Sequence, residues 1–326
     1  MSQSGWSWPS IGNDKVIEFL ERACQNDQLA QTYIFVGPDD LGKSTMAVAF
    51  ARNLQGNQEG FNSDLHVLQP EAGGKSISIE ATREFIKILD LSSFLNSYKI
   101  GIIKDANLLS EEAKSALLKT LEEPKDKVII ILLATDESDL PATILSRSQI
   151  LYFHPVSAAI IYDYLINDYG VSRSLAKDLA NLALGRPLVA LRTFEHPDDY
   201  RAYLEKAENW LSLIISDSSS RLKILDKIFS DKTWSKQALD SAGGVVLLIE
   251  GLARDLLLLN LGQPERLQHS ALLPLLEKTL AFLEEKSKTG SLPLIFRQLK
   301  LAAQAKEYLA ANVNPRLVLE QIAINI

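Results

Sequence analysis

The stretch Gly37–Thr45, with the sequence GPDDLGKST, carries residue types that can hold a chain of phosphates. It fits the pattern G-x-x-x-x-G-K-[ST], follows the apolar run Thr32–Val36 and opens the helical pattern MAVAFARNL. Glycines let backbone N–H groups converge on phosphate oxygens, Lys43 adds a positive charge, and Ser44 offers a hydroxyl to magnesium. The N-terminus of the following helix adds its dipole. We therefore expect ATP or ADP with Mg²⁺ to be held by Gly37, Gly42, Lys43, Ser44 and Thr45.

A loop of this shape can also persist without hydrolysing ATP, and the stretch KIGIIKDAN (99–107) bears on that alternative. A P-loop ATPase normally ends this strand with an Asp that holds magnesium, often followed by a Glu that activates water. If Lys104 occupies the metal position, its ammonium group repels the cation by several kcal/mol at an effective dielectric of about 20. If Asp105 is the metal ligand instead, Ala106 stands at the position of the base. Both alignments disfavour hydrolysis by this chain alone.

The composition is that of an ordinary globular protein, with 326 residues and a net charge of −7. This length predicts two or three domains. Proteins that hold DNA mainly by themselves usually carry a positive excess, so we expect no strong direct grip on nucleic acid. The chain opens without the pattern of a signal peptide and has no apolar run long enough to span a membrane. We expect a soluble, cytoplasmic protein without a membrane partner.

Side chains that bind metals are few. Cys24 is the single cysteine of the sequence, so neither a disulfide framework nor a multi-cysteine zinc site is expected. The four histidines are dispersed without the spacing of metal ligands, and we predict structural roles for them: His66, His154, His196 and His269. The sequence thus predicts no zinc and no dedicated metal cluster.

The first half of the chain alternates β-rich runs with helical patterns, which is typical of an α/β domain with a parallel sheet. Two runs, YIFV and VIIILLA, are continuously apolar, as expected of strands covered on both faces. The expected strands are Thr32–Val36, Leu65–Leu68, Lys99–Ile103, Lys127–Ala134 and Gln149–Phe153. Ser78 is expected to open a helix between the second and third strands.

The second half of the chain shows helical patterns only. Residues 157–195 indicate a small helical bundle, in which Ser172 caps one helix and Pro187 opens another. Residues 200–326 indicate long amphipathic helices, with breaks predicted at Gly243-Gly244 and at Gly262-Gln263-Pro264.

Several longer stretches resemble the AAA+ domain of bacterial clamp loaders. They are SISIEATREFIKIL, YKIGIIKDANLLSEEAKSALLKTLEEP and VIIILLATDESDLPATILSRSQILYF, in which ALLKTLEEP and LPATILSR are the most specific pieces. The opening IGNDKVIEFLERACQNDQLAQTYIFVGP and the later RDLLLLNLG are also similar to that family, so the resemblance covers essentially the whole chain. It implies an α/β AAA+ P-loop module with a parallel five-stranded sheet in residues 1–156. A helical lid in 157–198 and an all-α oligomerisation collar in 199–326 are expected to follow.

Two departures from the motor subunits of that family, the gamma/tau type, indicate which kind of subunit the chain resembles. Motor subunits usually end the third strand in an Asp-Glu pair, where this chain has Lys104-Asp105. They usually carry an Arg in the lid that reaches back to the nucleotide, and aligning GRPLVAL with that segment places Leu188 there. Many loaders also carry a four-cysteine zinc module, which a single cysteine cannot form. These departures favour the delta-prime type, a subunit that resembles a stator.

The same resemblance implies a role for Arg147 in ILSRSQ. In the family pattern Ser-Arg-Cys, this Arg projects into the ATP site of the neighbouring subunit as an arginine finger, a role worth about 10³–10⁵ in rate in other systems. Ser148 stands where Cys is usual, and the thiol has no part in the finger. A surface arginine in a local ion pair is the alternative. Thr135 falls at the family's nucleotide sensor, and the alternative there is a strand-end Thr that bonds a loop.

The function that the resemblance implies is that of a non-motor clamp-loader subunit of the DNA polymerase III holoenzyme. Such a subunit assembles with gamma/tau and delta subunits in a hetero-pentamer, and through them acts on the sliding clamp and primer-template DNA. It polymerises nothing itself. Two rival hypotheses stay open: an active gamma/tau-type ATPase, and a stand-alone P-loop nucleoside or nucleotide kinase.

Overall fold

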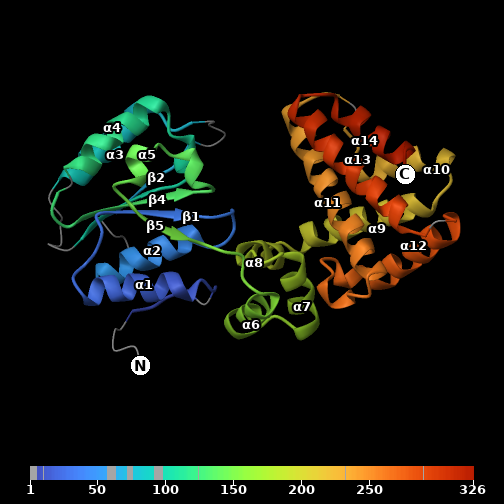
Figure 1. Ribbon diagram of the computed structural model, residues 1–326, viewed down its shortest axis with the longest axis horizontal. Coiled ribbons are helices and arrows are strands. Elements are labelled where there is room, and N and C mark those ends of the chain that lie inside the picture. Colours follow the sequence, from blue (N-terminus) through green and yellow to red (C-terminus); the bar gives the residue numbers. More distant parts are fainter. Residues whose placement is uncertain are drawn as a thin grey trace. The chain divides into compact units, whose positions relative to one another are not determined.

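The computed structural model describes residues 6–9, 11–56, 64–71, 76–91, 98–123, 125–231, 233–288 and 290–326. The chain forms two compact units (Figure 1). The first contains the residues up to Tyr164 together with Gly185–Leu188, and the second contains Leu165–Leu184 and Val189–Ile326. Within the described ranges, no helix has the length and apolar character needed to cross a membrane.

A parallel five-stranded sheet is the centre of the first unit, with the strand order β2-β3-β4-β1-β5. The strands are β1 Thr32–Val36, β2 Leu65–Leu68, β3 Lys99–Ile103, β4 Val128–Ala134 and β5 Gln149–Tyr152. The five predicted strands and the α/β class are therefore confirmed, although two strands are one residue shorter than expected. Strand β4 begins after Lys127, whose left-handed backbone (φ 60°) departs from strand geometry, and β5 ends before Phe153.

Helices cover both faces of this sheet, as Figure 1 shows. The elements are α1 Asp14–Gln25, α2 Lys43–Leu54, α3 Ile79–Asp90, η1 Ala106–Leu108, α4 Glu111–Glu122, η2 Glu137–Asp139 and α5 Ala142–Leu145. Successive side chains of a strand point to opposite faces. On β4, Ile130 and Leu132 pack in the core with α3 and α4, whereas Ile129 and Ile131 pack in the core with α1 and α2. This two-sided burial explains why the strand sequence is apolar without alternation.

Helix α3 is fixed at both ends and along its length. The Ser78 side chain accepts a hydrogen bond from the Ala81 N–H at 3.2 Å, which confirms the predicted cap. At the other end, the buried Lys99 donates to the Ile88 carbonyl at 2.8 Å, which satisfies one of the orphan carbonyls of the last turn. In β3, a Cβ added at Gly101 would lie only 2.6 Å from Cζ of Phe85, so the glycine lets α3 approach the sheet closely.

The remaining chain is helical, and the described residues after Tyr152 contain no strand. The elements are α6 Ala158–Tyr169, α7 Arg173–Leu182, α8 Pro187–Glu195, α9 Pro197–Ile215, α10 Ser218–Ile228, α11 Lys236–Asn260, η3 Pro264–Arg266, η4 Ser270–Leu272, α12 Leu273–Lys286, α13 Leu292–Ala310 and α14 Pro315–Ile324. Pro187 opens α8 as predicted. Ser172 occupies the N-cap position of α7, but its side chain accepts no capping hydrogen bond.

A buried polar network joins helices of the second unit. The ring of His269 contacts the Asp255 carboxylate through Nδ1 at 2.7 Å and the Tyr203 hydroxyl through Nε2 at 2.6 Å. Next to it, the Ser270 hydroxyl donates to the Asp178 carboxylate of α7 at 2.7 Å. Helix α7 is thereby tied to the more C-terminal helices. A separate lid in 157–198, with boundaries at 156 and 198, stays a prediction.

The break predicted at Gly243-Gly244 is wrong, because α11 continues through both glycines. Their flexibility destabilises a helix by about 1 kcal/mol per residue relative to alanine. This cost is outweighed by the buried side chains on either side, among them Ala242 and Val246. The second predicted break is confirmed, since α11 ends at Asn260 and Gly262 follows in the left-handed conformation (φ 69°).

This geometry predicts opposite effects of one substitution at two glycines of α11. A Cβ at Gly244 would meet no atom within 4 Å, so Gly244→Ala should raise the free energy of unfolding by about 1 kcal/mol. A Cβ at Gly251 would lie 2.8 Å from Oε1 of Gln268 and 3.0 Å from Cε1 of His269, whose ring is held by Asp255 and Tyr203, so Gly251→Ala should lower the free energy of unfolding. Chemical denaturation of both variants measures the two values. Equal effects of the same sign would contradict the packing described for α11.

Candidate functional site

The phosphate loop connects β1 to α2, and two of its glycines are required by close contacts. Gly42 lies at the N-cap of α2 with a left-handed backbone (φ 86°), a conformation that side chains other than glycine rarely adopt. A Cβ at Gly42 would also collide with the Ile11 side chain, and one at Gly37 would collide with the Phe153 carbonyl. The loop thus keeps the tight strand-to-helix turn that the sequence predicts.

Lys43 lies in the first turn of α2 and is buried. Its Nζ donates to the Gly37 carbonyl and, at 2.8 Å, to the Pro38 carbonyl. Burial lowers the pKa of this ammonium group, and nearby carboxylates, Asp39 first, oppose that shift. The Asp39 carboxylate lies 3.8 Å from Nζ. The cation that a phosphate requires is therefore present at the loop, but it shares the loop with acidic side chains.

A cavity of about 270 Å³ lies beside the loop. It brings together residues that the sequence singled out separately, from the loop, the ends of β3 and β4, and the start of α8. Its wall consists of Asp39, Asp40, Gly42, Lys43, Ser44, Lys104, Asp105, Asn107, Leu133, Ala134, Thr135 and Leu188. Gly37 and Thr45, which were also predicted to hold nucleotide, are not in this wall. The volume is small beside ordinary ligand pockets of roughly 300–1,000 Å³, and it suits phosphates better than a whole nucleotide.

The end of β3 supplies only one carboxylate to this cavity. Lys104 and Asp105 both line it, and Asp105 has a left-handed backbone (φ 51°) before η1. Ala106, which the sequence placed at the position of the base, is buried in the core, and Asn107 lines the cavity instead. Sequence reasoning missed Asn107, although it stands next in KDAN. Neither an amide nor a methyl group can accept a proton from water, so the cavity lacks the base of an ATPase at this point.

The charges around the cavity favour a nucleotide that arrives with a cation. The carboxylates of Asp39, Asp40 and Asp105 outnumber the ammonium groups of Lys43 and Lys104. Magnesium prefers oxygen ligands, which the Ser44 hydroxyl and the acidic side chains can provide. The residues present therefore fit Mg²⁺ with a phosphate chain better than a bare phosphate.

Two further predicted positions lie in the cavity wall. Leu188, which the resemblance aligned with an Arg of motor subunits, donates from its backbone N–H to the Asp40 carbonyl at 3.2 Å. Its apolar side chain adds no positive charge. The Thr135 hydroxyl donates to the Asp139 carboxylate at 3.0 Å, so this residue lines the cavity and also bonds the adjacent loop.

Arg147 follows α5 and does not contribute to the cavity wall. Its Nη1 donates to the Thr143 carbonyl at 3.0 Å, and its Nη2 lies 3.0 Å from Oε1 of Glu122. The turn that carries Arg147 is anchored to the core, because Ile144 is fully buried and the Ser148 hydroxyl donates to the Ile144 carbonyl at 2.8 Å. The local ion pair that the sequence left as an alternative thus exists within this chain, and Arg147 stays exposed on the surface.

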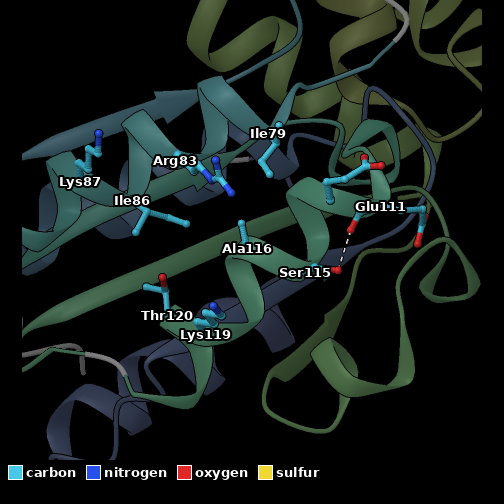
Figure 2. Close-up of a pocket in the computed structure, with 10 residues that line it drawn as sticks. Ile79, Arg83, Ile86, Lys87, Glu111, Ser115, Ala116, Lys119 and Thr120 are labelled. Carbon is cyan, nitrogen blue, oxygen red and sulfur yellow. Dashed lines mark hydrogen bonds between the residues drawn. The ribbon is translucent and has the colours of Figure 1, made fainter.

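A second hollow of about 630 Å³ lies between α3 and α4 and shares no residue with the phosphate cavity (Figure 2). Figure 2 shows Ile86 and Arg83 of α3 facing Ala116 of α4 across it. The side chains that line it carry both signs of charge, with Arg83 and Lys119 against Glu111. No motif in the sequence predicted this hollow.

Comparisons with known proteins find similarity to subunits of bacterial DNA polymerase III. A family model described as "DNA polymerase III, delta subunit" matches residues 12–157. DNA polymerase III subunit delta' of Bacillus subtilis is 25% identical over 98% of this chain and 98% of its own length. DNA polymerase III subunit gamma/tau of Mycoplasma pneumoniae is 31% identical, but over 48% of this chain and 25% of its own length. Among solved structures, a gamma-subunit-related protein of Thermotoga maritima matches with 18% identity and a TM-score of 0.49, over 93% of this chain and 97% of that one.

The delta' relative thus matches nearly the whole chain, including its helical second half, whereas the gamma/tau relative matches about half of it. The family model and these relatives together support a likeness to the delta' clamp-loader subunits of bacterial DNA polymerase III.

Proposed function

We propose that this chain is a stator of the clamp loader, which supplies Arg147 to the ATP site of a neighbouring gamma/tau subunit. One observation carries the proposal: Arg147 is presented on an anchored surface turn, outside the chain's own phosphate cavity. In a motor subunit the chain's own site would need a second carboxylate and a cationic lid residue. Here the buried Ala106 follows Asp105, and the side chains that line the cavity beside it are the amide of Asn107 and the apolar Leu188.

The contribution of Arg147 is electrostatic. Charge develops on the transferred phosphoryl group in the transition state, and a guanidinium placed there stabilises it without forming a covalent bond. The anchored turn supports this role, because Leu140 before α5 and Ile144 within it are buried and hold the backbone in place. A fixed backbone reduces the entropy that the side chain loses when it docks against a phosphate.

The chain's own loop has a different part in the proposal. Gly37, Gly42, Lys43, Ser44 and Thr45 hold ATP or ADP, and Thr135 contacts the phosphate end. The Mg²⁺ that accompanies the nucleotide screens its charge from the surrounding carboxylates. Because the cavity has no base next to Asp105, the nucleotide stabilises the module and is not turned over.

The helices of the second unit are proposed to hold the stator in the assembly. Large apolar side chains are exposed on this unit, among them Leu247, Leu261, Phe296 and Leu317. Exposed side chains of this kind mark protein interaction surfaces when they gather in patches. We propose gamma/tau and delta subunits as the partners in a cytoplasmic hetero-pentamer. The assembly loads the sliding clamp on primer-template DNA during replication.

Arg147→Ala should remove a substantial share of the ATP hydrolysis that clamp and primed DNA stimulate in the reconstituted loader. An arginine finger supplies about 10³–10⁵ at a single site in other systems, and other sites of the assembly keep their own fingers. Arg22→Ala is the matched control, since Arg22 is also an exposed arginine in an ion pair of the first unit. If both variants assemble and hydrolyse ATP like the wild type, the stator role of Arg147 is refuted.

The isolated chain should bind nucleotide without turning it over. Binding of Mg²⁺-ATP and of Mg²⁺-ADP is measured by calorimetry, and phosphate release by the same preparation is followed over time. Lys43→Ala should abolish the binding, because it removes the cation at the loop. Magnesium-dependent phosphate release that disappears in Lys43→Ala would instead support the rival, an active gamma/tau-type ATPase.

A further inference from the structure

The carboxylate that holds Arg147 comes from the end of a different helix. Glu122 is the last residue of α4, and its Oε1 lies 3.0 Å from Nη2 of Arg147. The side chains of Glu122 and Arg147 are 52% and 39% exposed. Both backbones are anchored in the same core, through Leu121 on α4 and Ile144 on α5. The pair therefore joins two fixed points across the surface of one module.

Glu122 stands at an unfavourable place for a carboxylate. The C-terminal end of a helix carries a partial negative charge, so acidic residues there are disfavoured and cations are preferred. Glu122 ends α4 and Glu123 occupies its C-cap, which brings two carboxylates to this end. An arginine from another element offsets this repulsion for Glu122. The same arrangement places a competing anion beside the residue that the stator offers to its neighbour.

The Arg147 guanidinium keeps unused N–H donors while it is paired with Glu122. An arginine has five N–H donors. Three hydrogen-bonding contacts are present: Nη1 with the Thr143 carbonyl and the Ser146 hydroxyl, and Nη2 with Glu122. A phosphate of a neighbouring nucleotide can therefore approach before the Glu122 contact is broken. Because exposed ion pairs are weak, a doubly charged phosphate group can displace the Glu122 carboxylate from the guanidinium.

We propose that Glu122 is a positioning residue that holds Arg147 on its own module until the neighbour's nucleotide phosphate displaces it. The proposal rests on the proposed function of Arg147 as an arginine finger. Glu122 acts as a brake on the unstimulated assembly, in which the subunits are not yet closed around clamp and DNA. Once closure brings the phosphate within reach, the guanidinium leaves the carboxylate and Glu122 no longer affects the rate.

The test is ATP hydrolysis by the reconstituted loader with and without clamp and primed DNA, for Glu122→Gln and its neighbour Glu123→Gln. The two variants make the same change of charge on adjacent residues, and only Glu122 pairs with Arg147. Glu122→Gln should raise unstimulated turnover by about two- to fivefold, the range that an exposed ion pair supports. It should change stimulated turnover much less, and Glu123→Gln should change neither.

A double variant separates this role from a general effect on structure. In the Arg147→Ala background, Glu122→Gln should have no effect on unstimulated turnover, because nothing is left to release. The inference is overturned if Glu122→Gln behaves like Glu123→Gln, if it lowers turnover, or if its effect persists without Arg147. Failure of the proposed function is a separate result, since Arg147→Ala alone would then leave stimulated turnover intact.

Discussion

The arrangement of both functional regions depends on burying one parallel sheet on both faces. Because β1, β3 and β4 run parallel, their carboxyl ends meet at one edge, where the phosphate loop, Lys104-Asp105 and Thr135 line a single cavity. Ligands of open α/β sheets bind at this edge for that reason. The core on one of these faces holds Leu121 and Ile144, the residues next to Glu122 and near Arg147 that anchor the two ends of the ion pair.

The phosphate cavity and the surface turn that carries Arg147 differ in what they can do chemically. The cavity has what is needed to hold phosphates, but beside Asp105 it has the amide of Asn107 and no base, and an apolar Leu188 stands in its wall. The surface turn offers a permanent cation that the chain's own cavity does not use. These features suit the proposed role, in which the module organises a reaction in a neighbour and its own nucleotide is a structural ligand. This division follows from a few side chains at the ends of strands and helices, while the fold beneath is that of an ordinary α/β module.

Much of the first unit could be predicted from the sequence, because continuous apolar strands and the Ser78 cap are local signals. The helix break at Gly243-Gly244 could not, since tertiary burial along α11 overrides the local preference of glycine. The motif and the resemblance predicted several residues of the cavity wall but not Asn107. The left-handed backbone at Asp105 directs Ala106 into the core, so that Asn107 lines the cavity instead. The ion pair between Glu122 and Arg147 could not be predicted either, because the two residues are 25 positions apart in the sequence. The one sequence signal was a carboxylate at the C-terminal end of a helix, where a nearby cation is favoured.

The central claim is that Arg147 leaves its own module to serve a neighbouring ATP site. A cryo-electron microscopy structure of the loader with a non-hydrolysable ATP analogue, closed on clamp and primed DNA, tests this claim most directly. We predict that the Arg147 guanidinium lies within hydrogen-bond distance of the neighbour's terminal phosphate and is separated from Glu122. An Arg147 that is still paired with Glu122, with another residue on that phosphate, would contradict it.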